Sequence, residues 1–164
     1  MRVLGLCIAL VIASCSSGGE YVKGGRQGGD VDRGETNGRM FDFVSNMPDG
    51  DDWQIRIRDN SLWAAYGDGE KVKDLGTAAI SSKDAAKIWE LVDAVEIPER
   101  KKGQPDEDEG FVELRLREPG GEDQHDLFKI FVSRADAEDD EEVVALAGQL
   151  QKLVEKYFKK KPEF

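Results

Sequence analysis

Two short segments of the chain alternate strictly between apolar and polar residues, and this pattern constrains the fold more than any other feature of the sequence. Residues 53–58 read WQIRIR and residues 112–117 read VELRLR. Successive side chains of a β-strand point to opposite faces, so each segment is predicted to be a strand with one buried and one polar face. The chain is therefore expected to form a sheet that is covered on one side.

Turn residues place further strands beside these two segments. Residues 59–61 read DNS, which is typical of a turn, and residues 62–66 follow as the returning strand. Residues 72–80 would add one more short strand. After the second segment, Pro119-Gly120-Gly121 turns the chain and residues 127–132 return it. The pattern predicts an antiparallel sheet of four or five strands, and no element is assigned to the apolar residues Met40, Phe41, Phe43 and Val44.

Two other segments carry apolar residues at helical spacing. The first begins at the candidate N-caps Ser81 and Ser82, has Asp84 in the position of a capping box, and ends before Pro98. The second runs over residues 140–160. The apolar stripes are Ala85, Ile88, Leu91, Val92 and Val95 in the first helix, and Val143, Leu146, Ala147, Leu150, Leu153, Val154 and Tyr157 in the second. We therefore predict an α+β fold with two helices packed on one face of the sheet.

A constant offset of 59 residues relates the two halves of the chain. It pairs Ile55 with Leu114, and it pairs the helix start at Ser81 with that at Asp140. The same offset pairs Ala85 with Val144, Ile88 with Ala147, Leu91 with Leu150, and Val95 with Val154. This is typical of a duplicated ββα unit whose two copies pack as one sheet. The alternative is a coincidence between two short amphipathic patterns.

The chain is acidic, with a formal net charge of −11. Nucleic acid and anionic lipid are bound by clustered Lys and Arg, so direct binding to either is not expected. An acidic run at residues 136–142 and several lysines at residues 152–161 lie at opposite ends of the second predicted helix. Each sign opposes the helix dipole there. We interpret these charges as structural, rather than as a metal site or a membrane contact.

The N-terminus has the features of a secretory signal. Arg2 gives a positive start, and residues 3–12 are an apolar run that only Gly5 interrupts. A bilayer-spanning helix needs about 20 apolar residues, so this run is too short to span a membrane. Residues 1–14 are therefore expected to be a leader and not part of the fold.

Ile12-Ala13-Ser14-Cys15 resembles the lipobox of bacterial lipoproteins, in which an aliphatic residue and two small ones precede a lipidated cysteine. The resemblance implies cleavage before Cys15, a diacylglycerol thioether on Cys15 and, in many bacteria, an amide-linked third chain such as palmitate. Such lipid would hold the protein on a membrane of the cell envelope. Ser16 stands where inner-membrane lipoproteins of Gram-negative bacteria tend to carry aspartate, so in such an organism the resemblance implies the outer membrane, facing the periplasm or the surface. The alternative is an ordinary signal peptide with an incidental cysteine.

Composition divides the rest of the chain into two parts. Residues 15–38 would be the lipidated cysteine and a flexible stalk rich in glycine pairs, and residues 39–164 would be a single α+β domain. Asp30 and Asp32 have the spacing of ligands in a calcium loop, but Gly34 stands where a further oxygen ligand is needed. We expect no metal ion and no cofactor.

Cysteine and histidine usage argues against several kinds of active site. Cys7 would leave with the leader and Cys15 would be acylated, so the mature chain would have no disulfide partner and no cysteine nucleophile. His125 is the only histidine, which excludes a Cys/His zinc set. We expect no Asp or Glu in an apolar setting that would raise its pKa. The protein is therefore not expected to be an enzyme, and a hydrolase that uses carboxylates alone is the alternative.

The alternation also predicts where positive charge is concentrated. If Ile55, Ile57, Leu114 and Leu116 face the helices, the opposite face carries Arg56, Arg58, Arg115 and Arg117, and Trp63 points the same way. Arg and Trp are enriched where partners bind, so these five residues form a candidate binding face. The alternative is a solvated face on which the arginines pair with Glu113 and lie over aromatic rings.

An order of two strands, helix, two strands, helix is similar to that of emfourin-like protease inhibitors. The similarity covers residues 53–158 in pattern only, and no residue motif is shared. The main functional hypothesis is a non-enzymatic lipoprotein that binds another envelope or secreted protein through the open sheet face. The resemblance implies a hydrolase inhibitor as one version of it, and a purely structural surface protein is the remaining alternative.

Overall fold

A computed structural model describes residues 38–67, 71–119 and 125–164. The predicted leader at residues 1–14, the lipidation site Cys15 and the predicted stalk up to residue 37 lie outside the described residues. The turn predicted at Gly120 and Gly121 lies outside them as well. The described residues therefore belong to the predicted α+β domain.

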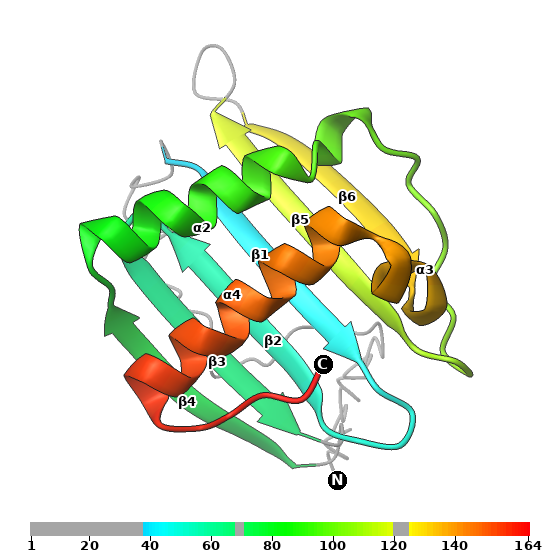
Figure 1. The fold of residues 1–164 in the computed structure, drawn as a ribbon, viewed down its shortest axis with the longest axis horizontal. Coiled ribbons are helices and arrows are strands. Elements are labelled where there is room, and N and C mark those ends of the chain that lie inside the picture. The colour runs from blue at the N-terminus through cyan, green and yellow to red at the C-terminus, as the bar shows by residue number, and fades with distance from the viewer. Residues whose placement is uncertain (1–37, 68–70, 120–124) are drawn as a thin grey trace, which may run out of the picture.

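The described strands form one antiparallel sheet of six strands in the order β4-β3-β2-β1-β5-β6 (Figure 1). Their bounds are β1 Met40–Asn46, β2 Asp52–Arg58, β3 Ser61–Gly67, β4 Val72–Ala79, β5 Phe111–Pro119 and β6 His125–Ser133. The fold is α+β with an antiparallel sheet, as predicted. The sheet has one strand more than the largest number predicted.

The additional strand, β1, lies inside the sheet and pairs antiparallel with both β2 and β5. Phe41 and Phe43 are fully buried on the side of the helices, and Asp42 between them points to the other side. Val44 places an apolar side chain on the polar face, so the segment lacks the strict alternation that marks β2 and β5. The sequence pattern alone therefore does not identify β1 as a strand.

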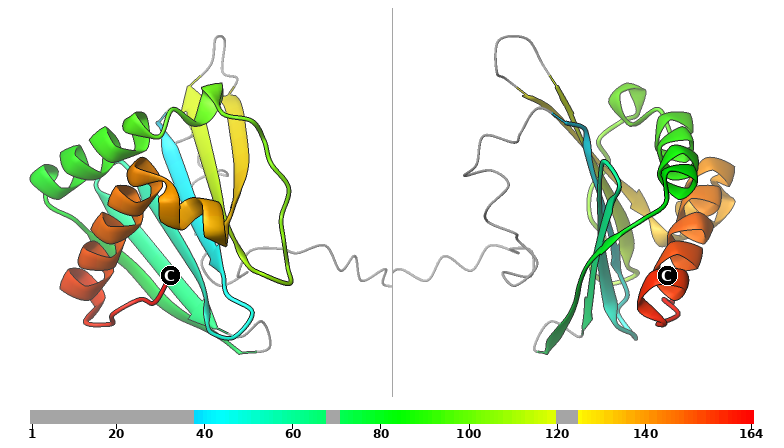
Figure 2. Two further views of the ribbon diagram at one scale, coloured as in Figure 1. Left: turned by 45° about the vertical axis from the view of Figure 1, so that its right-hand side comes forward. Right: turned by 90° about the vertical axis from the view of Figure 1, so that its left-hand side faces the viewer.

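Two longer helices cover one face of the sheet, as predicted, and Figure 2 shows them on the same side of it. Helix α2 spans Ser82–Ala94 with Ser81 as its N-cap, and helix α4 spans Glu141–Phe158 with Asp140 as its N-cap. The structure adds a short 3-10 helix, η1 at Ile97–Glu99, and a six-residue helix, α3 at Arg134–Asp139. Four strands precede α2, so the element order differs from the two strands, helix, two strands, helix on which the resemblance to emfourin-like inhibitors rested.

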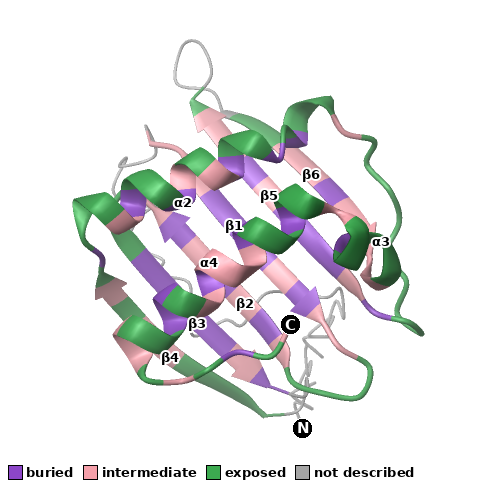
Figure 3. Ribbon diagram, in the orientation of Figure 1, coloured by how far each residue is buried: buried purple, intermediate pink, exposed green. Residues whose placement is uncertain are grey.

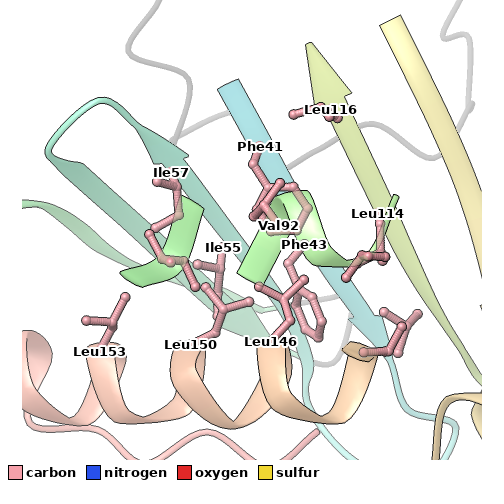
Figure 4. Packing of buried hydrophobic residues seen from close by; sticks show 14 of the residues in the cluster. Phe41, Phe43, Ile55, Ile57, Val92, Leu114, Leu116, Leu146, Leu150 and Leu153 are labelled. Carbon is pink, nitrogen blue, oxygen red and sulfur yellow. The ribbon is translucent and has the colours of Figure 1, made fainter. Parts of the chain in front are cut away.

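The core lies between the sheet and the two longer helices. Figure 3 shows buried residues along the inner sheet strands and along the sheet-facing sides of α2 and α4. In Figure 4, Leu146, Leu150 and Leu153 of α4 point toward the sheet. Fully burying one such side chain stabilises the fold by about 1.5–3 kcal/mol. Most of the buried apolar side chains of the sheet thus face the helices, and the opposite sheet face carries the polar residues of β2 and β5 together with a few apolar ones.

The predicted duplication holds for part of the chain and fails for the rest. Ser81 and Asp140 are both N-caps, and Ile55 and Leu114 both pair with Phe43 of β1. The helix pairing is wrong, because Ala85 is buried whereas Val144 is exposed. The buried stripes align at an offset of 58, one residue less: Ala85 with Val143, Ile88 with Leu146, Val92 with Leu150, and Val95 with Leu153. Among the described elements, β1, β4, η1 and α3 have no counterparts.

Both edges of the sheet deviate from regular, open strands. Beside β6, the backbone N–H of Phe131 donates to the carbonyl of Lys102 at 2.7 Å. Gly103 follows with a positive φ of 66°, and a Cβ there would lie 2.1 Å from the Phe131 carbonyl oxygen, so only glycine fits. On the other edge, the register of β4 shifts opposite Ala64 and Ala65. The edges are therefore partly blocked for pairing with another strand.

Polar contacts join one end of α4 to α2 and the other end to Arg100, which follows α2 after the 3-10 helix η1. At one end, the carboxylate of Asp84 accepts hydrogen bonds from Lys156 Nζ at 2.6 Å and from Tyr157 Oη at 2.7 Å. At the other end, Arg100 forms an ion pair with Asp140, the N-cap of α4. These contacts hold the two helices antiparallel across the sheet.

The contact at Asp84 predicts an acid-dependent loss of stability. Hydrogen bonds from Lys156, Tyr157 and Ser81 lower the pKa of Asp84 to about 2, below the value of about 3.9 expected in the unfolded chain. The contribution is therefore complete above about pH 4 and is lost as the pH falls through about 2. Thermal unfolding of Asp84→Asn should show a lower melting temperature than wild type at pH 6 and a much smaller difference at pH 2. A constant difference across this pH range would contradict the assignment.

Candidate binding face

The sheet face that α2 and α4 do not cover carries the predicted arginines. Ile55, Ile57, Leu114 and Leu116 are buried toward the helices, and the alternation places Arg56, Arg58, Arg115 and Arg117 on the opposite face. The four arginines come from β2 and β5, the strands on either side of β1. Strand β1 thus decides how they are spaced.

The register of β1 arranges the arginines in two rows. In one row Asp42 pairs with Arg56 of β2 and with Arg115 of β5. In the next row Met40 pairs with Arg58 and with Arg117. Neighbouring strands lie about 4.8 Å apart, so the two arginines of each row are separated by about 10 Å at the backbone. The central position of each row is therefore flanked by an arginine on both sides.

The central position of the first row holds a buried carboxylate. Asp42 is only 8% exposed, and its Oδ1 lies 2.6 Å from Arg56 Nε. Burial raises the pKa of the Asp42 carboxyl, while Arg56 and, at longer range, Arg117 act in the opposite direction. Because a buried charge is costly unless it is paired, Asp42 holds Arg56 in a defined position on the face.

A second buried carboxylate, Glu113, anchors two further cations. It is 5% exposed, forms an ion pair with Arg115, and lies 3.1 Å from Lys129 Nζ. Burial raises the pKa of Glu113, opposed by the hydrogen bond from Lys129, and burial lowers the pKa of Arg115 to about 10. The expectation that no carboxylate would have a raised pKa is therefore wrong for Asp42 and Glu113. The long side chains of neighbouring arginines cover these acids, which the composition of the segments does not reveal.

Trp63 lies on the same face as the arginines, in register with Arg56. The guanidinium of Arg56 lies 5.9 Å from the centre of its ring, and its Nε1 donates to Asp74 Oδ1 at 2.9 Å. The side chain is only 6% exposed. Trp63 therefore offers little surface to a partner and serves mainly to support Arg56.

Three residues on this face are absent from the prediction. Met40 and Asp42 belong to β1, which the sequence pattern does not assign to a strand, and Lys129 pairs with Arg115 across β5 and β6. Leu127, which pairs with Arg117, is also notable because it is a large apolar side chain that is 63% exposed. Leu127 and Lys129 are two residues apart, so the alternation of β6 places them on one face. That this is the arginine face follows only from the register of β6 against β5.

Charges away from this face agree only in part with the helix-dipole interpretation, because Asp136, Glu138 and Asp139 belong to the separate helix α3 and not to the N-terminus of α4. Asp140 caps α4, Glu141 and Glu142 lie in its first turn, and Lys156 lies in its last turn. His125 begins β6. Within residues 38–67, 71–119 and 125–164, no group of three or more His, Asp or Glu is arranged to hold a metal ion. In the same residues, no helix is both long and apolar enough to cross a membrane.

Comparisons with known proteins assign no family to the chain. No protein-family model matches it, and no curated protein matches it. The residues of the face are therefore the basis on which a function can be proposed.

The buried position of Glu113 can be tested by titration. Since burial raises its pKa and the hydrogen bond from Lys129 lowers it, Lys129→Met should raise the pKa of Glu113 further. Between the unfolded value of about 4.3 and the raised folded value, the folded state holds more protons, so this group's contribution to stability falls as the pH rises. Carbon-13 NMR of the side-chain carboxyl should show the raised pKa and its further rise, with exposed Lys152→Met as the control. An unchanged Glu113 titration in Lys129→Met would contradict the contact.

Proposed function

We propose that the protein is a lipid-anchored lipoprotein of the bacterial cell envelope that binds another envelope or secreted protein through the arginine-bearing sheet face. The observation that carries the proposal is the concentration of positive charge on that face in a chain with a net charge of −11. The cations around β1 are Arg56, Arg58, Arg115, Arg117 and Lys129. The carboxylates buried among them are Asp42 and Glu113.

This imbalance supports binding rather than a purely structural role. The two buried carboxylates carry less charge than the five cations around them, whereas the chain as a whole is acidic. The arginines also stand on strands inside a sheet, so their positions are set by backbone pairing rather than by a loop. A rigid cationic face on an acidic body suits a protein partner with a complementary acidic patch.

Lipidation of Cys15 would keep this face near a membrane of the envelope. The Gly-rich residues 15–38 would act as a stalk between the lipid and the domain. In a Gram-negative organism, Ser16 favours the outer membrane as the location. The acidic body would be repelled by anionic headgroups, which supports a protein rather than the bilayer as the partner of the face.

The anchor can be tested separately from the face. Cys15→Ala should abolish incorporation of radiolabelled palmitate in growing cells and shift the protein from the membrane to the soluble fraction, because the thioether lipid cannot form. Cys7→Ala is the matched control and should leave both readouts unchanged. Membrane retention of Cys15→Ala without label would show that some other feature holds the protein.

The binding role can be tested by crosslinking and co-purification from intact cells. Arg58→Gln combined with Arg117→Gln should weaken capture of the partner by at least about a hundredfold, since two charged donors are removed and each charge-assisted hydrogen bond to a partner contributes about 1.5–3 kcal/mol. This variant leaves Asp42 and Glu113 with their own cations, so the fold should be kept. Lys83→Gln combined with Lys152→Gln removes the same charge from exposed helix positions and should capture the partner normally.

Other outcomes of this experiment favour the alternatives. Equal capture by the face variant and the control would contradict the site, and no partner in any sample would favour the structural role. If the captured partner is a hydrolase that the protein inhibits, the result supports the hypothesis that the protein is a hydrolase inhibitor. Burial raises the pKa of Asp42 and Glu113, so these two acids are the candidates for a carboxylate-only hydrolase, which would lose activity in Asp42→Asn while the control pair kept it.

A further inference from the structure

We infer that the face binds a carboxylate of its partner at Arg117, in the row in which Met40 lies between Arg58 and Arg117. This inference rests on the proposed function and specifies the chemistry of the partner. The ligand would be an extended acidic segment of a protein, with a Glu or Asp side chain at the Met40 position.

The two rows repeat the same arrangement along β1. Met40 and Asp42 are two residues apart and point to the same face, and each pairs with one arginine of β2 and one of β5. The rows have the same backbone register and the same flanking residues. They differ in the centre, where one row has a carboxylate and the other has an uncharged thioether. In the Asp42 row the central carboxylate pairs with Arg56, whereas Met40 supplies no carboxylate at the centre of its row.

Arg117 is placed to receive such a carboxylate. Asp42 forms its ion pair with Arg56, and Glu113 forms ion pairs with Arg115 and Lys129. Within the part of the chain that the structure describes, Arg117 has no hydrogen bond or ion pair of its own, and acts on Asp42 only through longer-range attraction. An arginine held on a strand, half-buried and without a carboxylate partner among these residues, is suited to accept one from another molecule.

Leu127 favours a peptide carboxylate over a free anion or a lipid headgroup. It pairs with Arg117 on the next strand, lies on the same face and is 63% exposed. An apolar side chain beside the arginine offers contact to the methylene groups of a peptide, whereas a small inorganic anion makes no use of it. The net charge of −11 also disfavours approach to an anionic bilayer.

The inference is tested with the purified full chain in neutral detergent. The probe is a capped peptide of alternating Glu and Leu, and the same peptide with Gln in place of Glu is its counterpart. Isothermal titration calorimetry should show binding of the Glu peptide and at least about tenfold weaker binding of the Gln peptide. Inorganic phosphate and phosphatidylglycerol vesicles are tested in parallel.

Two variants locate the binding. Arg117→Gln should weaken binding of the Glu peptide about tenfold because it removes one charged donor. Met40→Asp should also abolish most of the binding, because it places the chain's own carboxylate between Arg58 and Arg117, and the fold should tolerate it as it tolerates Asp42. Val144→Asp adds the same charge at an exposed position on α4 and should bind as wild type does.

The outcomes separate this inference from the proposed function. Equal binding of the Glu and Gln peptides, or unaltered binding by Met40→Asp, would overturn the carboxylate site. Binding of phosphate or vesicles through Arg117 with no binding of the Glu peptide would overturn it in favour of a phosphate ligand. In either case, partner capture that still depends on Arg58 and Arg117 in cells would leave the protein-binding function standing.

Discussion

The pairing of β1 with both β2 and β5 is the constraint on which the rest of the structure depends. Phe41 and Phe43 bring two fully buried aromatic side chains to the middle of the core, and Asp42 between them faces away from it. A shift of one residue in this pairing would turn the arginines of the flanking strands toward the helices. The core and the cationic face are thus set by the same backbone register, and neither can change without the other.

The two buried carboxylates give the face its order. Long arginine side chains lose much conformational freedom when they are fixed, and Asp42 and Glu113 hold three of the nearby cations through direct contacts. Burial disfavours these charges, as their raised pKa values show, so the ion pairs contribute more to arrangement than to stability. A partner would meet side chains that are already ordered, which reduces the entropy lost on binding.

Sequence patterns predict the parts of this fold in which alternation or helical spacing is unbroken. The strands β2 and β5, the caps at Ser81 and Asp140, and the direction of the arginines follow from such patterns. Strand β1 does not, because Val44 interrupts its alternation, and helix α3 is too short to show a period. The offset of 59 residues misplaces Val144 because the helix stripe slips by one residue, which rotates a helical position by about 100°.

The candidate face is partly predictable for the same reason: alternation places Arg56, Arg58, Arg115, Arg117 and Trp63 on one side of the sheet. The alternation does not show which strand lies between β2 and β5. Asp42 and Met40 are therefore recognised as part of the face only once the order of the strands in the sheet is known.

The irregular edges of the sheet bear on how such a protein behaves when many copies are crowded together. The carbonyl of Lys102 occupies one backbone N–H of β6, Gly103 packs closely against the same strand, and the register of β4 shifts at the opposite edge. Both irregularities disfavour regular pairing with the edge of another copy, so growth into ordered fibrils is hindered. The chain can therefore expose a broad sheet surface at high local concentration while disfavouring self-association through its edge strands.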